Sequence, residues 1–531
     1  MHRALQIDEI VGIICAQTAR AGPSDWWAGL PTQQYPSRCG DLARLARTCT
    51  AFLDPALDAL WGFQGTLLHL LRAMPSDLWE IIEIPWEEDE DAANDSGSRE
   101  ENMRLTISLR RTVRPSDWDR FTFYARRVRS FKDGHVHDET SVVYDILTSQ
   151  FPNGTVFPRI EILDWFPIAL ELFHHIHLFL SHGITGLHIS LDNTADSAIF
   201  DLLTTQFPGL KNVGIGGTVA ERPFSRFICS LKELETLVAP KLDSTAFNHI
   251  SRLPRLRYLW LMSKTPPRLP PRPKDLPCFP ALAEFRCESI EAAPNLLERT
   301  GRSLVEFSLP ARSWASPPTK QIFQELYAAL ASSCTHTLLE KIHVDKPSRA
   351  LPINAAQLDL YILSGDDLRK LFCFRNLVHV SLAHSVAVDL DDVVAIDMAR
   401  AWPRIEVLWF PCDTTYRIAS RMTLEGVYAF AEHCPLLEDL SVLFDATTVP
   451  KSTGTLGGKT QPRVSQDKLA FLDVGYSMIG TKKKDWRRVA DFLRSIFPEL
   501  YEVRATKPGS SVDPYVLKEY KAWMKVSDDL A

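Results

Sequence analysis

The sequence lacks the features that mark secreted proteins and membrane proteins. Its ten cysteines are scattered singly and form no C-x-x-C pair, so we expect free thiols in a reducing compartment. The stretch from Trp165 to Leu180 is the most apolar, yet it is interrupted by polar residues and is shorter than the ~20 residues that cross a bilayer. The first ten residues hold no uninterrupted apolar run, so no signal peptide is expected. These absences favour a cytoplasmic or nuclear protein.

Motifs for catalysis are also missing. There is no G-x-S-x-G, no Walker loop and no H-E-x-x-H. Two histidine groups, His135-x-His137 and His174-His-Ile-His177, have no partner pair at the spacing that a zinc site requires. We therefore expect no catalytic residue, no cofactor and no metal site.

An excess of positive charge is absent as well. Lys and Arg number 59 against 66 Asp and Glu, and the formal net charge is -7. Such a balance argues against nucleic acid as the main partner. One basic cluster, Lys482-Lys-Lys-Asp-Trp-Arg-Arg488, could be a nuclear signal, an anion-binding patch or the solvated start of a helix.

What the sequence does contain is one recurring phrase, aromatic-Pro-x-Leu-x-x-Leu-x-Leu. Clear copies are Phe207-Pro-Gly-Leu-Lys-Asn-Val-Gly-Ile215, Leu253-Pro-Arg-Leu-Arg-Tyr-Leu-Trp-Leu261 and Trp402-Pro-Arg-Ile-Glu-Val-Leu-Trp-Phe410. A phrase that returns at such intervals marks a solenoid, whose units bury their apolar faces against one another. The alternative, a chance series of Leu-rich helices, requires many coincidences of phase.

The first apolar residue of each core marks the register. The marks are Ile160, Ile184, Leu210, Leu234, Leu256, Leu282, Leu304, Leu339, Leu377, Ile405, Leu437, Leu469 and Leu500. Their spacing varies from 22 to 38 residues, so the repeats are irregular. We expect the array to occupy residues 155–508, with residues 509–531 forming a capping helix.

Each core predicts a short strand, and the stretches between cores predict helices. Apolar residues at helical spacing occur in residues 199–207, 322–331, 427–433 and 489–497. Proline at the end of such a helix stops it before the next strand. The predicted fold class is therefore α/β, a leucine-rich-repeat solenoid shaped as an irregular horseshoe with parallel strands along its inner face.

Residues 1–61 have a different, helical pattern. Ile7, Ile10, Val11 and Ile14 lie at i, i+3, i+4 and i+7, and Leu42 begins a second series that continues to Leu53. Asp54-Pro55 is expected to start a third short helix that ends at Trp61. Residues 62–154 form a connecting segment, in which the acidic stretch 86–102 reads as a solvated loop.

The N-terminal segments resemble an F-box. The resemblance rests on Leu5-Gln-Ile-Asp-Glu-Ile10, Leu42-Ala-Arg-Leu-Ala-Arg-Thr-Cys-Thr-Ala-Phe52 and Ala56-Leu-Asp-Ala-Leu-Trp61, and together with the repeats it is similar to fungal F-box/leucine-rich-repeat proteins. It implies a non-catalytic substrate receptor of an SCF-type cullin ubiquitin ligase, whose F-box helices bind the Skp-type adaptor. The implied adaptor-binding residues are Leu5, Ile7, Ile10, Ile14, Leu42, Leu45, Cys49, Phe52, Leu53 and Trp61. The alternatives are a helical cap that binds no adaptor and a repeat scaffold outside any ligase.

The repeat face would bind the target protein, whose identity the sequence does not give. One outward position lies between the last two apolar residues of each core, and these positions should form a stripe along the concave face. Trp and Arg are favoured in interface hot spots. We therefore predict partner contacts at Trp260, Arg286, His343 and Trp409, unless insertion loops or the C-terminal segment cover them.

Overall fold

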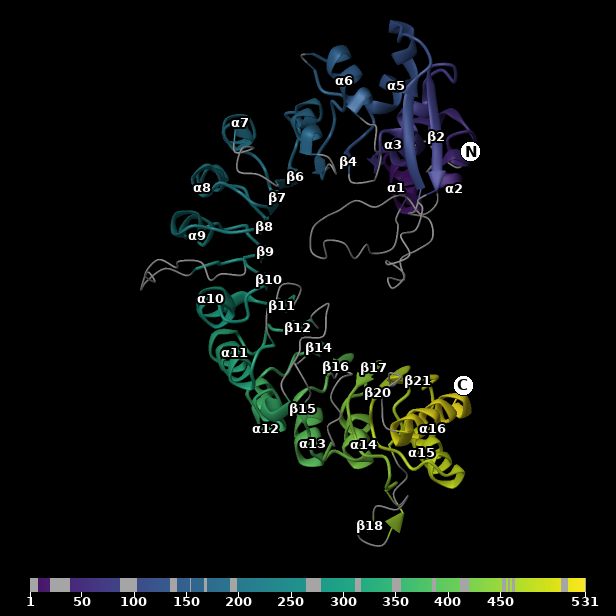
Figure 1. The fold of residues 1–531 in the computed structure, drawn as a ribbon, viewed down its shortest axis with the longest axis vertical. Coiled ribbons are helices and arrows are strands. Elements are labelled where there is room, and N and C mark those ends of the chain that lie inside the picture. The colour runs from purple at the N-terminus through teal and green to yellow at the C-terminus, as the bar shows by residue number, and fades with distance from the viewer. Residues whose placement is uncertain are drawn as a thin grey trace. The chain divides into compact units, whose positions relative to one another are not determined.

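The protein is described by a computed structural model, which divides into two compact units, residues 1–240 and 241–531 (Figure 1). The described residues are 8–19, 39–85, 103–133, 141–152, 154–166, 170–191, 198–263, 278–310, 317–345, 355–383, 388–410, 420–450, 455–456, 459–460, 464–507 and 514–530. Each unit is a mixture of helices and a parallel sheet. Among the described residues, no helix combines the length and the apolar character needed to cross a bilayer.

The first unit opens with three helices, α1 (Asp8–Ala19), α2 (Cys39–Leu45) and α3 (Thr50–Trp61), which we call the head. Their buried residues form a small core of their own. The expected helix start at Pro55 is wrong, because α3 begins at Thr50 and contains that proline. The break falls earlier, where Cys49 is extended and the hydroxyl of Thr48 donates to the carbonyl of Leu45.

Residues 62–133 link the head to the repeats. They contain β1 (Phe63–Gln64), α4 (Leu68–Ala73), α5 (Trp118–Ala125) and β4 (Ser130–Asp133). Strands β2 (Trp79–Pro85) and β3 (Met103–Leu109) pair as an antiparallel hairpin. Strands β1 and β4 pair in parallel, and β4 pairs with the first predicted repeat strand. The parallel sheet therefore includes two strands upstream of residue 155, which the repeat phrase did not indicate.

The sheet of the first unit continues through four repeat strands. These are β5 (Ile162–Trp165), β6 (Gly186–Leu191), β7 (Asn212–Gly217) and β8 (Thr236–Ala239). They alternate with α6 (Ser141–Gln150), which precedes β5, then the 3-10 helix η3 (Leu170–Leu178), α7 (Ala198–Gln206) and α8 (Glu221–Ser230). Neighbouring strands pair in parallel without a break in register.

The second unit holds nine strands of the same kind within its described part. They are β9 (Tyr258–Leu261), β10 (Glu284–Cys287), β11 (Glu306–Leu309), β12 (Lys341–Val344), β14 (His379–Leu382), β16 (Val407–Trp409), β17 (Asp439–Ser441), β20 (Phe471–Gly475) and β21 (Glu502–Ala505). Across both units, every strand from β5 to β12 and β14, β16, β17, β20 and β21 begins two residues after its register mark. The predicted repeat strands are thus confirmed.

Helices connect these strands and cover one side of the sheet in this unit (Figure 1). They are α9 (Ser244–Ile250), α10 (Ala293–Thr300), α11 (Lys320–Ser333), α12 (Gly365–Leu368), α13 (Asp392–Ala401), α14 (Leu424–His433) and α15 (Lys483–Ile496). The 3-10 helices η5 (Gly301–Ser303), η6 (Ala355–Leu360) and η7 (Arg369–Cys373) supplement them. Two minor pairings, β13 (Leu363–Ser364) with β15 (Val388–Asp389) and β18 (Thr455–Leu456) with β19 (Lys459–Thr460), lie outside the main sheet.

The last helix, α16 (Pro514–Leu530), packs against β21 and α15. Its Trp523 is buried, meets the ring of Phe444 edge-on at 5.7 Å and donates its indole N–H to the carbonyl of Ser477 at 2.8 Å. A buried indole with a satisfied N–H anchors a helix firmly, since apolar burial and the hydrogen bond act together. The predicted C-terminal helix therefore covers the last strand, as a terminal cap of a repeat array does.

Candidate functional site

The candidate site is the side of the second unit's sheet that faces away from the connecting helices. Residues at every second strand position point to it, because side chains alternate across a strand. The first row consists of Tyr258, Glu284, Glu306, Lys341, His379, Val407, Asp439, Phe471 and Glu502. The second row consists of Trp260, Arg286, Ser308, His343, Ser381, Trp409, Ser441, Asp473 and Arg504. We call the surface formed by these two rows the strand face.

Between the rows lies a line of apolar residues that point into the core. They are Leu259, Phe285, Phe307, Ile342, Val380, Leu408, Leu440, Leu472 and Val503, none more than 2% exposed. This line fixes the register, because a slip of one residue would turn all of these side chains out of the core. The second row is the stripe expected from the sequence, and its members lie side by side. The four predicted partner contacts all belong to it.

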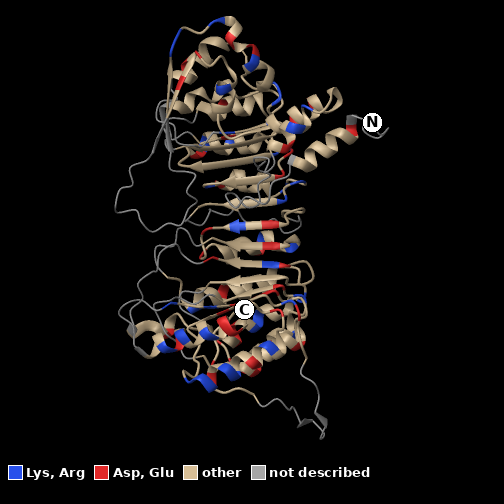
Figure 2. Cartoon of the chain, turned by 90° about the vertical axis from the view of Figure 1, so that its right-hand side faces the viewer, with Lys and Arg blue, Asp and Glu red and all other residues tan. Residues whose placement is uncertain are grey.

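At β9 to β12 the charges of the strand face are compensated. Glu306 is the centre: it accepts a hydrogen bond from Arg286 at 3.2 Å and one from Ser308 at 3.3 Å, and Lys341 lies 3.7 Å from its other oxygen. The Arg286 guanidinium also lies over the ring of Tyr258, 5.7 Å from its centroid. Trp260 beside it is only 6% exposed, so little of this predicted contact is open to a partner. Figure 2 shows acidic and basic residues interspersed along the strands.

Two histidines occupy the next positions. The rings of His343 and His379 lie 4.4 Å apart between centroids. Burial lowers the pKa of both imidazoles, and for His379 the neighbouring His343 adds to the effect, so that its pKa is about 4. Both rings are therefore neutral near pH 7, and they can serve a partner as hydrogen-bonding groups but not as cations.

At β16 to β21 the strand face is acidic and partly aromatic. Trp409 is 37% exposed, and its indole hydrogen-bonds to Asp439. Burial raises the pKa of Asp439, with the Trp409 hydrogen bond opposing the shift. Asp473 accepts hydrogen bonds from the Ser441 hydroxyl at 3.1 Å and the Gly475 N–H at 3.0 Å. Of the predicted contacts, Trp409 is thus the most accessible aromatic side chain.

The first unit carries a buried pair on the corresponding side of its own sheet. The ring of His188 donates from Nδ1 to Asp164 at 2.5 Å, and both side chains are almost fully buried. Gly214, the next residue in register, leaves room for the imidazole, since a Cβ there would lie 2.9 Å from it. The sequence placed all three in the stripe, but their burial depends on neighbours that the repeat phrase does not specify.

In the head, five of the ten residues predicted to bind the adaptor lie in the head's own core or pack against it. Leu42 and Phe52 are buried there, together with Val11, Cys15, Ala46 and Ala56. Ile14, Leu45 and Cys49 are packed against this core, Ile10 is half-buried, and Trp61 stacks on Tyr124 with centroids 4.2 Å apart. Leu5 and Ile7 lie outside the described residues.

Two apolar side chains of the head point outward instead. Leu53 is 41% exposed, and Ile13, which the sequence pattern did not single out, is 60% exposed. Ile13 falls outside the i, i+3, i+4, i+7 series of its helix, and that offset is the signal that could have identified it. Ile10, Val11 and Ile14 of α1 are half-buried or buried, because their spacing places them on one side of the helix.

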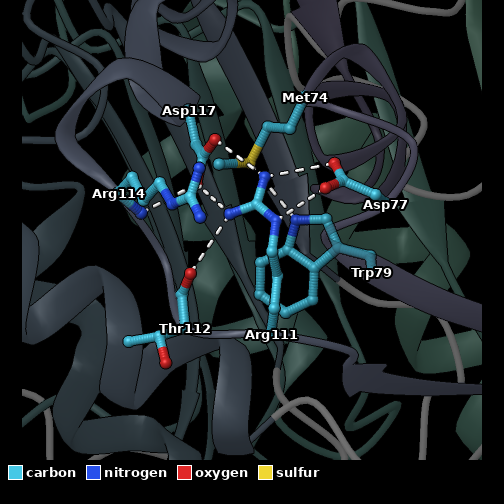
Figure 3. Close-up of polar contacts among 7 residues, drawn as sticks. All are labelled: Met74, Asp77, Trp79, Arg111, Thr112, Arg114 and Asp117. Carbon is cyan, nitrogen blue, oxygen red and sulfur yellow. Dashed lines mark hydrogen bonds and ion pairs between the residues drawn. The ribbon is translucent and has the colours of Figure 1, made fainter.

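The head is tied to the segment that follows it by ion pairs. Arg127 is 5% exposed and binds both Asp54 and Asp58 of α3. Further along, Arg111 lies between Asp77 and Asp117 at the base of the β2–β3 hairpin (Figure 3), with distances of 2.8 and 2.7 Å. Trp79 Nε1 hydrogen-bonds to the sulfur of Met74 at 3.3 Å in the same place. These contacts hold the hairpin in a defined orientation within the first unit.

Within the described ranges, no three His, Cys, Asp or Glu side chains lie close enough to hold a metal ion.

No protein-family model matches the chain, and no curated protein matches it. Among solved structures, it is similar to a chain in the crystal structure of the Rad7 and Elc1 complex in yeast. The identity is 14%, the match covers 68% of this chain and 73% of that chain, and the TM-score is 0.32.

Proposed function

We propose that this protein is a non-catalytic substrate receptor of an SCF-type cullin ubiquitin ligase. The head would bind the Skp-type adaptor, and the strand face would hold a target protein. The observation that carries the proposal is the packing of the head. Its helices bury a core of their own and still expose the apolar side chains of Ile13 and Leu53. Contact with an adaptor would remove the apolar surface of these two side chains from water, which favours binding.

The strand face supports the second half of the proposal. Its two rows include Trp409, Tyr258 and Arg286 on a sheet, and aromatic residues and arginine are enriched in protein interfaces. Fixed strands lower the entropy cost of ordering these side chains on binding. No chemistry is needed from this chain in such a role.

The test is co-expression of the full chain with a Skp-type adaptor and measurement of co-purification. The double variant Ile13→Glu/Leu53→Glu should abolish binding, because charges would replace the exposed apolar side chains of the head. Val393→Glu is the matched control, since Val393 on α13 is 63% exposed and lies outside the head. Deletion of residues 1–61 should have the same effect as the double variant.

If the folded full-length protein binds no Skp-type adaptor, the proposed role in a ligase is wrong. The chain would then be a repeat scaffold with a helical cap, which is the alternative that the sequence leaves open. Binding that survives in the double variant, with the adaptor captured by another part of the chain, would contradict the assignment of the head.

A further inference from the structure

The strand face contains a recurring arrangement of an aromatic ring, a carboxylate and a guanidinium. Arg286 of the second row lies over the ring of Tyr258 and binds Glu306, both of the first row. Arg504 of the second row lies over Phe471, 4.9 Å from its centroid, and binds Glu502 at 2.8 Å. In each case the ring and the carboxylate of the first row hold the cation of the second row. Cation–π attraction and a charge-assisted hydrogen bond reinforce each other in this geometry.

A ring and two carboxylates also lie on neighbouring strands in this part of the strand face, but here the ring and one carboxylate belong to the second row, and the set includes no guanidinium. Its ring is Trp409 and its carboxylates are Asp439 and Asp473, on the neighbouring strands β17 and β20. The register neighbours that a cation could occupy are Val407 and Ser441. We call Trp409, Asp439 and Asp473 the Trp409 site.

The negative charge of the Trp409 site is only partly balanced. Arg504 acts on Asp439 and Asp473 electrostatically, but its hydrogen bonds go to Glu502. The outward positions of β16, β17, β20 and β21 carry three carboxylates, Asp439, Asp473 and Glu502, against the single cation Arg504. The raised pKa of Asp439 has burial as its main cause, and Asp473 and Glu502 add repulsion to it. An added cation would offset this repulsion and favour the charged form of Asp439.

We propose that the Trp409 site binds an arginine side chain from a partner protein, which would bring a guanidinium to a ring and carboxylates, as Arg286 and Arg504 do in the other two sets. Arginine fits better than lysine because its planar guanidinium can stack on an indole while it donates to carboxylates on two strands. This inference deepens the proposed function by naming the chemistry of the target segment. It rests on that proposal only in taking the strand face as the target-binding surface, and it does not require the adaptor.

A partner segment of the opposite charge is disfavoured by the same residues. An acidic peptide or a nucleic acid would bring anions against Asp439 and Asp473, where burial limits screening by salt. A cluster of exposed cations, Lys482 to Lys484, Arg487 and Arg488, lies at the start of α15 and not on the strand face. A basic peptide is therefore expected to bind at the strand face, and an acidic peptide at the start of α15.

The test uses fluorescein-labelled Gly-Ser-Arg repeat peptide and its Gly-Ser-Lys, Gly-Ser-Gln and Gly-Ser-Glu counterparts, with binding to the full-length protein measured by fluorescence anisotropy. The Arg peptide should bind most tightly, followed by the Lys peptide. Asp473→Asn should weaken the Arg peptide about tenfold by removing a charge-assisted contact. Trp409→Ala should weaken it about threefold to tenfold through loss of the cation–π contact, and Trp409→Phe should restore part of that loss.

The matched control is Glu298→Gln, which removes one negative charge from an exposed position on α10 in the same unit. It should change the affinity less than about twofold, because exposed charges more than a Debye length apart are largely screened. Thermal melting of each variant shows whether its fold is retained. Should Trp409→Ala fail to fold, the Asp473→Asn and Asp439→Asn variants still decide the question.

Three outcomes would overturn the inference: no binding of the Arg peptide, equal weakening by Glu298→Gln and Asp473→Asn, or preference for the Glu peptide. The adaptor assay is independent of these. Loss of adaptor binding with an intact Arg-peptide site would defeat the ligase role alone. Adaptor binding without peptide discrimination would defeat the inference alone.

Discussion

Arg111 and Asp117 are joined by two hydrogen bonds, of 2.7 and 3.0 Å, from the two terminal guanidinium nitrogens to the two carboxylate oxygens. The backbone N–H of Arg114 donates to the same carboxylate at 2.7 Å. Arg111 also donates to both carboxylate oxygens of Asp77 and to the carbonyl of Thr112, so one guanidinium connects the residues before β2 with those before α5. Bidentate pairs of this kind fix orientation as well as distance.

Replacing Asp117 with Asn should loosen the base of the hairpin, because the amide cannot accept from both guanidinium nitrogens and from the Arg114 N–H. We expect the melting temperature of the first unit to fall by about 2–4 °C, the usual effect of one lost interaction in a unit of this size. Asp119→Asn on α5 is the control, since Asp119 is exposed. Equal effects of the two substitutions in thermal melting would argue against a special role for the clamp.

The same pair predicts a dependence on pH. The hydrogen bonds from Arg111 and from the Arg114 N–H lower the pKa of Asp117 from 3.8 to about 2. A lowered pKa in the folded state means that the stabilisation is complete above pH 4 and is lost as the pH falls toward 2. The difference in stability between the wild type and Asp117→Asn should therefore be constant from pH 7 to pH 4 and shrink below it. A difference that fades already near pH 6 would contradict this assignment.

His379 predicts a second loss of stability as the pH falls, in a higher pH range. Its pKa is lowered from 6.5 to about 4, so the folded protein takes up the proton less readily than the unfolded chain does. Stability is therefore lost as the pH falls from 6.5 to 4, and is unaffected by this group above that range. We expect the His379→Gln variant to lose less stability than the wild type over this interval. NMR titration should show the His379 ring remaining neutral until the pH approaches 4, and a midpoint near 6.5 would refute the burial argument.

The repeat strands were predictable because their signal is both local and repeated. In the phrase, proline ends one element and the apolar alternation begins the next, so each strand starts two residues after its mark. Strand β4 was not predicted, because the pattern there is Val128-x-x-Phe131-x-Asp133, which has an acidic residue in the third apolar position. Strand β1 has two residues and no such pattern at all.

The properties of the site were less predictable, because they depend on neighbours in space. Trp260 and Trp409 occupy the same slot of the phrase, yet one is 6% and the other 37% exposed. The compensation of Arg286 by Glu306, 20 residues further along the sequence, and the raised pKa of Asp439 likewise depend on side chains of different strands. The periodicity of the phrase predicts the stripe, whereas the exposure and charge balance of its side chains depend on which strands and loops surround them.

Gly217 at the end of β7 offers a test of backbone geometry in the repeats. Its φ of +76° is disfavoured for residues with a side chain, and an added Cβ would lie 2.0 Å from the carbonyl oxygen of Leu191. That same oxygen accepts a hydrogen bond from the N–H of Thr218 at 2.6 Å, so it cannot easily move away. Gly217→Ala should therefore destabilise the first unit by about 1–3 kcal/mol.

Gly209, in the turn before β7, provides the matched control, because nothing lies within 4 Å of the Cβ that Ala would add there. We expect Gly209→Ala to change the stability by less than about 0.5 kcal/mol. Urea denaturation gives the two free energies of unfolding, and hydrogen exchange at β6 and β7 shows whether the loss is local to the pairing of Leu191 with Gly217. Similar costs for the two substitutions would mean that the carbonyl yields to the new methyl group, and that the end of β7 is not held as the contacts of Leu191 imply.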